Sequence, residues 1–219
     1  MTTPGRPPRT PGGGAAWERL LAPTPSYSAR VSTGADTFDQ ALASLRAVRF
    51  RPELTIDEGP APQRLAPHAV ALTADFVEDD EELASGRFVL LHDPDGVDAW
   101  EGSYRAVVFL RALLEPDLAT DPLLTGVAWA WLLESLEAQG GPRTALGGTV
   151  TRVMSESFGA LGERDVTGSI EIRASWTPLG DPDDMGLEAQ AWAAALAQAA
   201  GLLPLPPGVS ALAPPRRGA

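Results

Sequence analysis

The sequence IEIRASW at residues 170–176 carries the clearest structural pattern in the chain, because apolar and polar side chains alternate strictly along it. A period of two residues indicates a strand with one face in the core and the other in water. Glu171 and Arg173 fall on the wet face of this strand. Residues 147–158 precede it and are the expected partner in a hairpin.

The expected partner strand has a less regular pattern. The face that looks inward holds two charged residues among apolar ones: Val150, Arg152, Met154, Glu156 and Phe158. An unpaired buried charge is too costly to persist. Arg152 and Glu156 would stand about 13 Å apart along a strand, which is too far for them to pair with each other.

Two interpretations of these charges remain open. The first is structural: the residues lie at an edge, or each pairs with another ion of the scaffold. The second is functional, and makes the second hairpin an Arg-lined site for a carboxylate or phosphate. Under the functional interpretation, the candidate ligand-binding residues are Arg152, Glu156 and Arg173.

The layout around this hairpin resembles one earlier in the chain. Each half reads helix, strand, strand, helix, and in each the second strand runs into an Asp-Pro-Asp turn, at residues 93–95 and 181–183. Two αββα half-repeats would explain this layout, and chance recurrence of a common turn would explain it equally well.

The remaining elements are expected from periodicity, capping residues and prolines. The acidic run at residues 78–82 indicates a hairpin between two of the strands, and Leu54 and Ile56 fit a short edge strand. Helices are expected at 36–50, from about 98 to 115, at 122–139 and at about 184–200, and further strands at 70–77 and 87–91. We therefore expect an α+β fold, with a mostly antiparallel sheet of about four strands packed by about four helices.

The two ends of the chain differ in composition from the part between them. Residues 1–34 are rich in Pro and Gly, and residues 203–219 contain five prolines. Such segments bury too little apolar surface to offset the entropy of ordering. We expect a disordered arm at 1–34, a single domain at 35–202 and an extended Pro-rich tail at 203–219.

Composition narrows the classes of function. The formal net charge is −12, which disfavours nonspecific binding to nucleic acid and to anionic membranes. All 17 basic residues are Arg, and the absence of Cys removes disulfides and thiolate metal sites. No apolar stretch approaches the roughly 20 residues that a membrane span needs, and the start of the chain does not resemble a secretory signal. We therefore expect a cytoplasmic protein.

The sequence contains no recognisable catalytic set. The chain has two histidines, and neither is placed as a base for the hydroxyls of Ser155 and Ser157. The acidic run with Asp93 and Asp95 lacks the spacing of a calcium loop. We expect no catalytic residues, no metal and no cofactor, although a triad assembled in space would leave no local signature.

Several stretches resemble a known family. They are HDP at residues 92–94, WEG at 100–102, DPLL at 121–124, GGTVTRV at 147–153, SESFG at 155–159 and EIRASWTP at 171–178. They resemble an actinobacterial family known as domain of unknown function 3000, over roughly residues 35–200. The resemblance implies an actinobacterial source, which agrees with the absence of Lys, and it implies no activity, cofactor or catalytic residue.

The absence of a catalytic set, the Pro-rich ends and the six Trp together favour a non-catalytic protein-interaction or regulatory module. The competing hypothesis is a small-anion binding protein or enzyme that uses the Arg-lined site on the second hairpin. The expected partner is a protein whose identity, like the oligomeric state, the sequence leaves open.

Overall fold

A computed structural model of the protein describes residues 34–203. Ten helices and strands follow one another in this part. They are α1 (Gly34–Ala47), β1 (Thr55–Gly59), β2 (His68–Glu78), β3 (Glu81–Val97), β4 (Gly102–Leu114), α2 (Pro116–Thr120), α3 (Leu124–Gln139), β5 (Arg143–Ser155), β6 (Thr167–Pro178) and α4 (Met185–Ala199).

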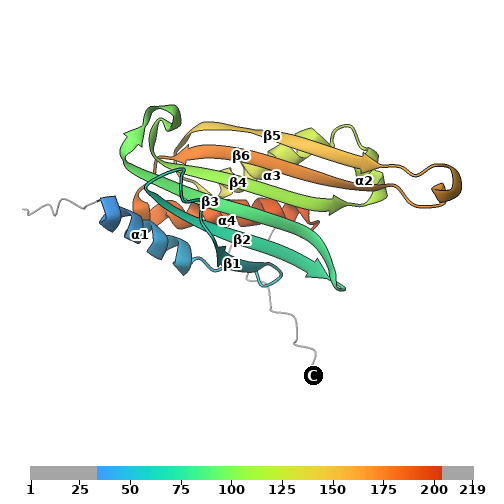
Figure 1. The fold of residues 1–219 in the computed structure, drawn as a ribbon, viewed down its shortest axis with the longest axis horizontal. Coiled ribbons are helices and arrows are strands. Elements are labelled where there is room, and N and C mark those ends of the chain that lie inside the picture. Colours follow the sequence, from blue (N-terminus) through green and yellow to red (C-terminus); the bar gives the residue numbers. More distant parts are fainter. Residues whose placement is uncertain (1–33, 204–219) are drawn as a thin grey trace, which may run out of the picture. The chain divides into compact units, whose positions relative to one another are not determined.

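The strands form one antiparallel sheet in the order β1-β2-β3-β4-β6-β5. Helices α3 and α4 lie behind this sheet in Figure 1, and α1 lies beside α4. Side chains from the helices and from alternate positions of the strands form a single large core, in which Trp176, Trp192 and Phe88 are fully buried. The described part is therefore α+β, with its main core on one side of the sheet.

The acidic link between β2 and β3 is the predicted hairpin. Asp79 and Asp80 both have positive φ angles, 49° and 65°. Positive φ at both central residues belongs to the two-residue turn whose twist matches that of antiparallel strands. The helix predicted at 122–139, the last helix and the second hairpin are also confirmed, with boundaries shifted by a few residues.

Two expectations about the sheet are corrected. The sheet has six strands instead of about four, and the helix expected from about residue 98 to 115 is instead strand β4. Alternate residues from Tyr104 to Leu114 are buried on the helix side, but Val107, Phe109 and Leu113 give the other face an apolar character as well. Apolar residues on both faces concealed the period of two that would have indicated a strand.

The αββα half-repeat is also wrong. The second half does read helix, strand, strand, helix, as α3, β5, β6 and α4. The first half has β4 at the position where a repeat requires a helix. The predicted domain boundaries stay a prediction, because the arm at 1–34 and the tail at 203–219 lie almost wholly outside the described residues.

A buried carboxylate joins the helices to the strands. Glu188 of α4 is 4 % exposed, and its Oε2 accepts hydrogen bonds from Arg143 Nε at 2.9 Å and from Trp176 Nε1 at 2.6 Å. Arg143 also donates to the backbone carbonyl of Leu136, near the end of α3. One ion pair therefore connects α4, β5, β6 and α3 at a single point.

The two histidines of the chain lie together in a ring cluster under α1. His92 is 2 % exposed, and its ring lies 4.3 Å from that of Tyr104 and 5.6 Å from that of His68, between centroids. Phe38 of α1 stacks on both histidines. Burial lowers the pKa of His92, repulsion from His68 lowers it further, and nearby Asp93 opposes both effects.

We expect the substitution Glu188→Ala to lower the free energy of unfolding by about 3–5 kcal/mol, because it leaves Arg143 buried without its counter-ion. The matched control is Glu58→Ala, which removes an exposed ion pair with Arg46 and should cost about 1 kcal/mol or less. Urea denaturation of both variants measures the difference. Equal losses in the two variants would show that the buried pair does not hold the layers together.

We also expect stability to fall as the pH falls below the unfolded pKa of histidine. The folded pKa of His92 is below its ordinary value, so the unfolded state binds more protons in this range and protonation favours unfolding. Few other side chains titrate between about pH 7.5 and 5.5. Urea denaturation at the two pH values should show this loss, and His92→Phe should reduce it. An unchanged pH dependence in that variant would contradict the assignment to His92.

Candidate functional site

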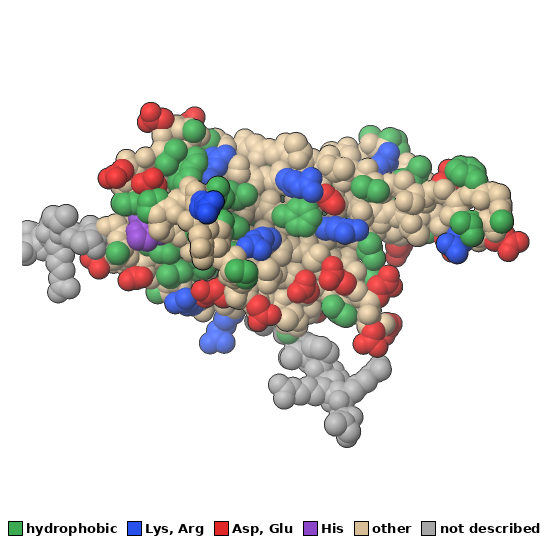
Figure 2. All heavy atoms as spheres, viewed as in Figure 1, with side chains coloured by type: hydrophobic (Ala, Val, Ile, Leu, Met, Phe, Trp, Pro, Cys, Tyr) green, Lys and Arg blue, Asp and Glu red, His purple; other side chains and the backbone are tan. Residues whose placement is uncertain are grey.

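Among residues 34–203, no helix lies over the centre of one face of the sheet, and we call this face the open face. Four arginines lie on it, Arg87 of β3, Arg105 and Arg111 of β4, and Arg173 of β6. Figure 2 shows this face, with basic side chains around a hydrophobic patch in its middle and most acidic side chains toward its margins. Residues 34–203 contain 28 of the 29 acidic residues but only 11 of the 17 arginines, so this gathering of positive charge runs against the local composition.

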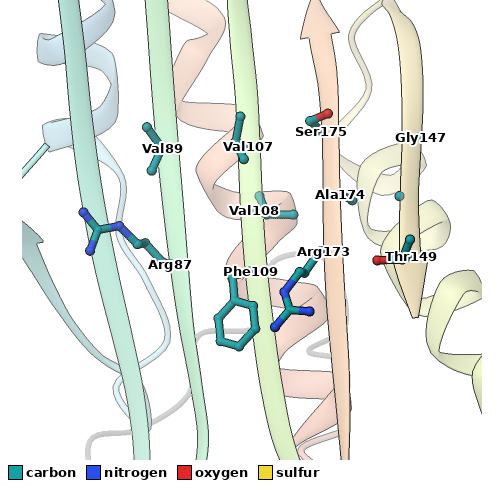
Figure 3. Close-up of a pocket in the computed structure, with 11 residues that line it drawn as sticks. Arg87, Val89, Val107, Val108, Phe109, Gly147, Thr149, Arg173, Ala174 and Ser175 are labelled. Carbon is teal, nitrogen blue, oxygen red and sulfur yellow. The ribbon is translucent and has the colours of Figure 1, made fainter. Parts of the chain in front are cut away.

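The strand register places three of these side chains in one row. Arg87 is the partner of Phe109, and Phe109 is the partner of Arg173. Figure 3 shows the guanidinium of Arg173 beside the ring of Phe109, whereas the side chain of Arg87 extends away from the ring on its other side. The Cζ atom of Arg173 is 5.3 Å from the centre of that ring, within the range of a cation–π contact.

The row borders an open hollow of about 580 Å³. Val89 and Val107 contribute apolar surface to the hollow, and Thr149 and Ser175 contribute hydroxyl groups. Gly147 lies at its β5 side, where a Cβ would meet nothing within 4 Å, so this side stays open. Ligand pockets commonly have volumes of about 300–1,000 Å³ and combine apolar lining with a few polar groups.

A network of hydrogen bonds fixes Arg105 beside the hollow. Its guanidinium donates to the carbonyl of Ala145 at 3.1 Å, to Thr177 Oγ1 at 3.1 Å and to Ser175 Oγ at 2.6 Å. Burial lowers the pKa of Arg105, and Glu101 opposes this effect. A guanidinium nevertheless stays charged at neutral pH, so Arg105 adds a fixed positive charge to this end of the face.

Most of the positive charge on the open face is not neutralised by ion pairs. Arg173 pairs with Glu171 at 2.7 Å, but the arginine side chain is 60 % exposed. Arg87 donates to the carbonyl of Pro60. Within the described residues, none of the other three arginines forms an ion pair; they are Arg87, Arg105 and Arg111. The face can therefore accept negative charge from another molecule.

The three candidate residues from the sequence do not come together. Arg173 lies on the open face, whereas Arg152 points to the helix side and donates to the carbonyl of Asp121. Glu156 is exposed beyond the end of β5. The face expected to point inward is only partly covered, because Met154 and Phe158 are also exposed.

Sequence reasoning missed Arg87, Arg105 and Phe109. Arg105 and Phe109 were overlooked because their segment was expected to be helical, where they would not share a face with Arg111. As a strand, the same spacing of two residues places all three on one side. The charged pair Arg105 and Arg111, with Val107 and Phe109 between them, is the signal that could have indicated a basic sheet face.

The structure offers no evident metal centre. In the part of the chain that it describes, no three His, Cys, Asp or Glu side chains gather closely enough to hold an ion. Between residues 34 and 203, no helix is both long and apolar enough to cross a bilayer. The expected absence of a cofactor stays a prediction.

Comparison with known proteins identifies a family. No curated protein and no solved structure matches the chain. A family model described as a protein of unknown function, DUF3000, matches residues 34–210, which is most of the chain and includes every element described above. The chain therefore belongs to the DUF3000 family.

Proposed function

We propose that this protein is a non-catalytic binding module, whose open face holds a partner that carries carboxylate or phosphate groups. The observation that carries the proposal is the row of Arg87, Phe109 and Arg173 on a sheet face without helices over it. Guanidinium groups suit carboxylates and phosphates because their fixed fork of donors matches two acceptor oxygens at once.

The apolar part of the hollow adds a second requirement for the ligand. Val107 is 37 % exposed on this face, beside Phe109 and Val89. Exposed apolar side chains favour contact with apolar or aromatic groups of a partner. An anionic group that also brings an apolar body would therefore contact both the arginines and the surface between them.

The lining of the hollow supports binding over catalysis. Thr149 and Ser175 are its hydroxyl-bearing side chains, and no His, Asp or Glu is among the lining residues to act as their base. Both histidines lie in the ring cluster under α1. The proposal thus joins the interaction module and the anion binder expected from the sequence. Cytoplasmic location, actinobacterial origin and the absence of nucleic-acid and membrane partners stay predictions.

The dye 8-anilinonaphthalene-1-sulfonate tests this proposal, because it combines an aromatic body with one anionic group. We expect the native full-length protein to bind it, and the double variant Arg87→Ala, Arg173→Ala to bind at least about tenfold more weakly. Hydrogen bonds to charged groups contribute about 1.5–3 kcal/mol each, and about 1.4 kcal/mol is tenfold in affinity. Fluorescence titration at several salt concentrations measures the affinity, which should fall as salt rises.

The matched control is Arg49→Ala, Arg164→Ala, which removes the same charge from two exposed positions away from the hollow. Circular dichroism confirms that both double variants are folded. If the control weakens dye binding as much as the open-face variant does, the effect is one of net charge and the proposed site is wrong.

A further inference from the structure

The two edges of the sheet differ in how well they are protected. At one edge, β1 has only five residues, and its Glu58 is held by Arg46 of α1. At the other edge, β5 has 13 residues, and no strand in the described part of the chain lies beyond it. A strand at an edge presents unpaired backbone N–H and C=O groups that can pair with another chain.

Strand β5 lacks most of the features that prevent an edge strand from pairing with another chain. It contains no Lys, Pro, Asp or Glu, and Arg152 turns toward the helix side to reach the carbonyl of Asp121. An irregularity between Thr144 and Gly147 disturbs the pairing near its start, whereas residues 147–155 pair regularly with β6. Short length, charged side chains and prolines normally protect such edges. The edge formed by residues 147–155 is therefore open to an added strand.

The basic hollow reaches this open edge. Gly147 and Thr149 of β5 line the hollow, and their partners on β6 are Ser175 and Arg173. A strand added outside β5 would lie two strand spacings from β6, which is about 10 Å. The side chains of Arg and Glu together can span that distance. The path from the edge to Ser175 passes Gly147, which has no side chain, and the path to Arg173 passes Thr149.

An added strand would require Arg173 to exchange its ion-pair partner, and this exchange costs little free energy. Arg173 is paired with Glu171, but this ion pair is largely exposed on the arginine side. Exposed pairs contribute little to stability. A carboxylate from an added strand could therefore replace or share this contact, and Arg105 is fixed nearby by Ser175.

The charges of the chain's own terminal segments do not suit them to occupy the edge of β5. Residues 1–33 contain four Arg and one acidic residue, and residues 204–219 contain two Arg and no acidic residue. Both are also rich in Pro, which cannot donate to a strand ladder. A second copy of β5 brings Arg143 and Arg152 but no carboxylate. The complementary occupant is therefore an acidic segment of another protein.

We propose that the anionic partner is an extended acidic segment of another protein, which adds to the edge of β5 as a further strand. This inference rests on the proposed function and specifies its ligand. Acidic side chains at alternate positions face Arg173 and Arg105. The intervening side chains lie on the helix side, beside the partly buried Val150 and the exposed Met154, so they are apolar. Backbone pairing supplies affinity, and the alternating side chains supply specificity.

An acetylated and amidated octapeptide of repeating Glu-Val tests this inference against the full-length protein. Its matched control has the same side chains, but every backbone N–H is methylated, so it keeps the charge and loses the donors. We expect the parent peptide to bind, and the methylated peptide to bind at least about tenfold more weakly, because it loses several backbone hydrogen bonds. Calorimetry measures both affinities.

Hydrogen exchange and a point variant give independent readouts. Binding of the parent peptide should slow amide exchange at residues 147–155, and 8-anilinonaphthalene-1-sulfonate should leave exchange there unchanged. Arg173→Ala should weaken binding of the parent peptide at least about tenfold, whereas Arg164→Ala should leave that binding unchanged. A repeating Lys-Val octapeptide should not bind.

The remaining outcomes separate the two proposals. Equal binding of the parent and methylated peptides overturns strand addition and leaves anion binding intact. Binding of the dye but of neither peptide shows that the ligand is a small anion. A stable dimer with residues 147–155 protected in the absence of peptide assigns the edge to a second copy. If neither the dye nor a peptide binds, both proposals fail.

Discussion

The long helices α1, α3 and α4 of residues 34–203 pack on one side of a single sheet, and the remaining features depend on that one-sided burial. Alternate residues of every central strand enter the core, where the carboxylate of Glu188 ties α4 to Arg143 and Trp176. The other residues of the same strands lie on the second face, where Ala71, Val89 and Leu91 are packed under neighbouring apolar residues and the rest face water or a partner. The open face is thus a necessary consequence of how the core is built.

The open face has a composition unlike that of the acidic chain around it. Phe109 lies between Arg87 and Arg173, and Arg105 is held rigidly by hydroxyl and carbonyl oxygens. Three guanidinium groups around apolar surface make this face basic within an acidic chain. The ligand proposed above, which brings carboxylates or phosphates, would complement this charge, and the edge of β5 lies beside it.

Strands are predicted correctly from the sequence where polar and apolar residues alternate clearly. Residues 170–176 have a polar and an apolar face, and the strand was predicted correctly. Residues 104–114 are apolar on the helix side and partly apolar on the open face, so their pattern predicts a helix where the structure has β4, and the first half-repeat is wrong for the same reason. Arg173 was singled out from its wet strand face. Its neighbours Arg87, Arg105 and Phe109 meet it only through the pairing of β3, β4 and β6. The spacing of Arg105, Phe109 and Arg111 becomes informative once that segment is read as a strand.

The most direct test of this account is the reactivity of individual arginines in the full-length native protein. Phenylglyoxal modifies accessible guanidinium groups, and peptide mapping by mass spectrometry gives a rate for each site. The account predicts that Arg111 and Arg173 react about as fast as the exposed Arg164, whereas Arg143, 11 % exposed, reacts much more slowly. If Arg111 and Arg173 are protected as strongly as Arg143, the open face is covered, and it is not the binding surface proposed for it.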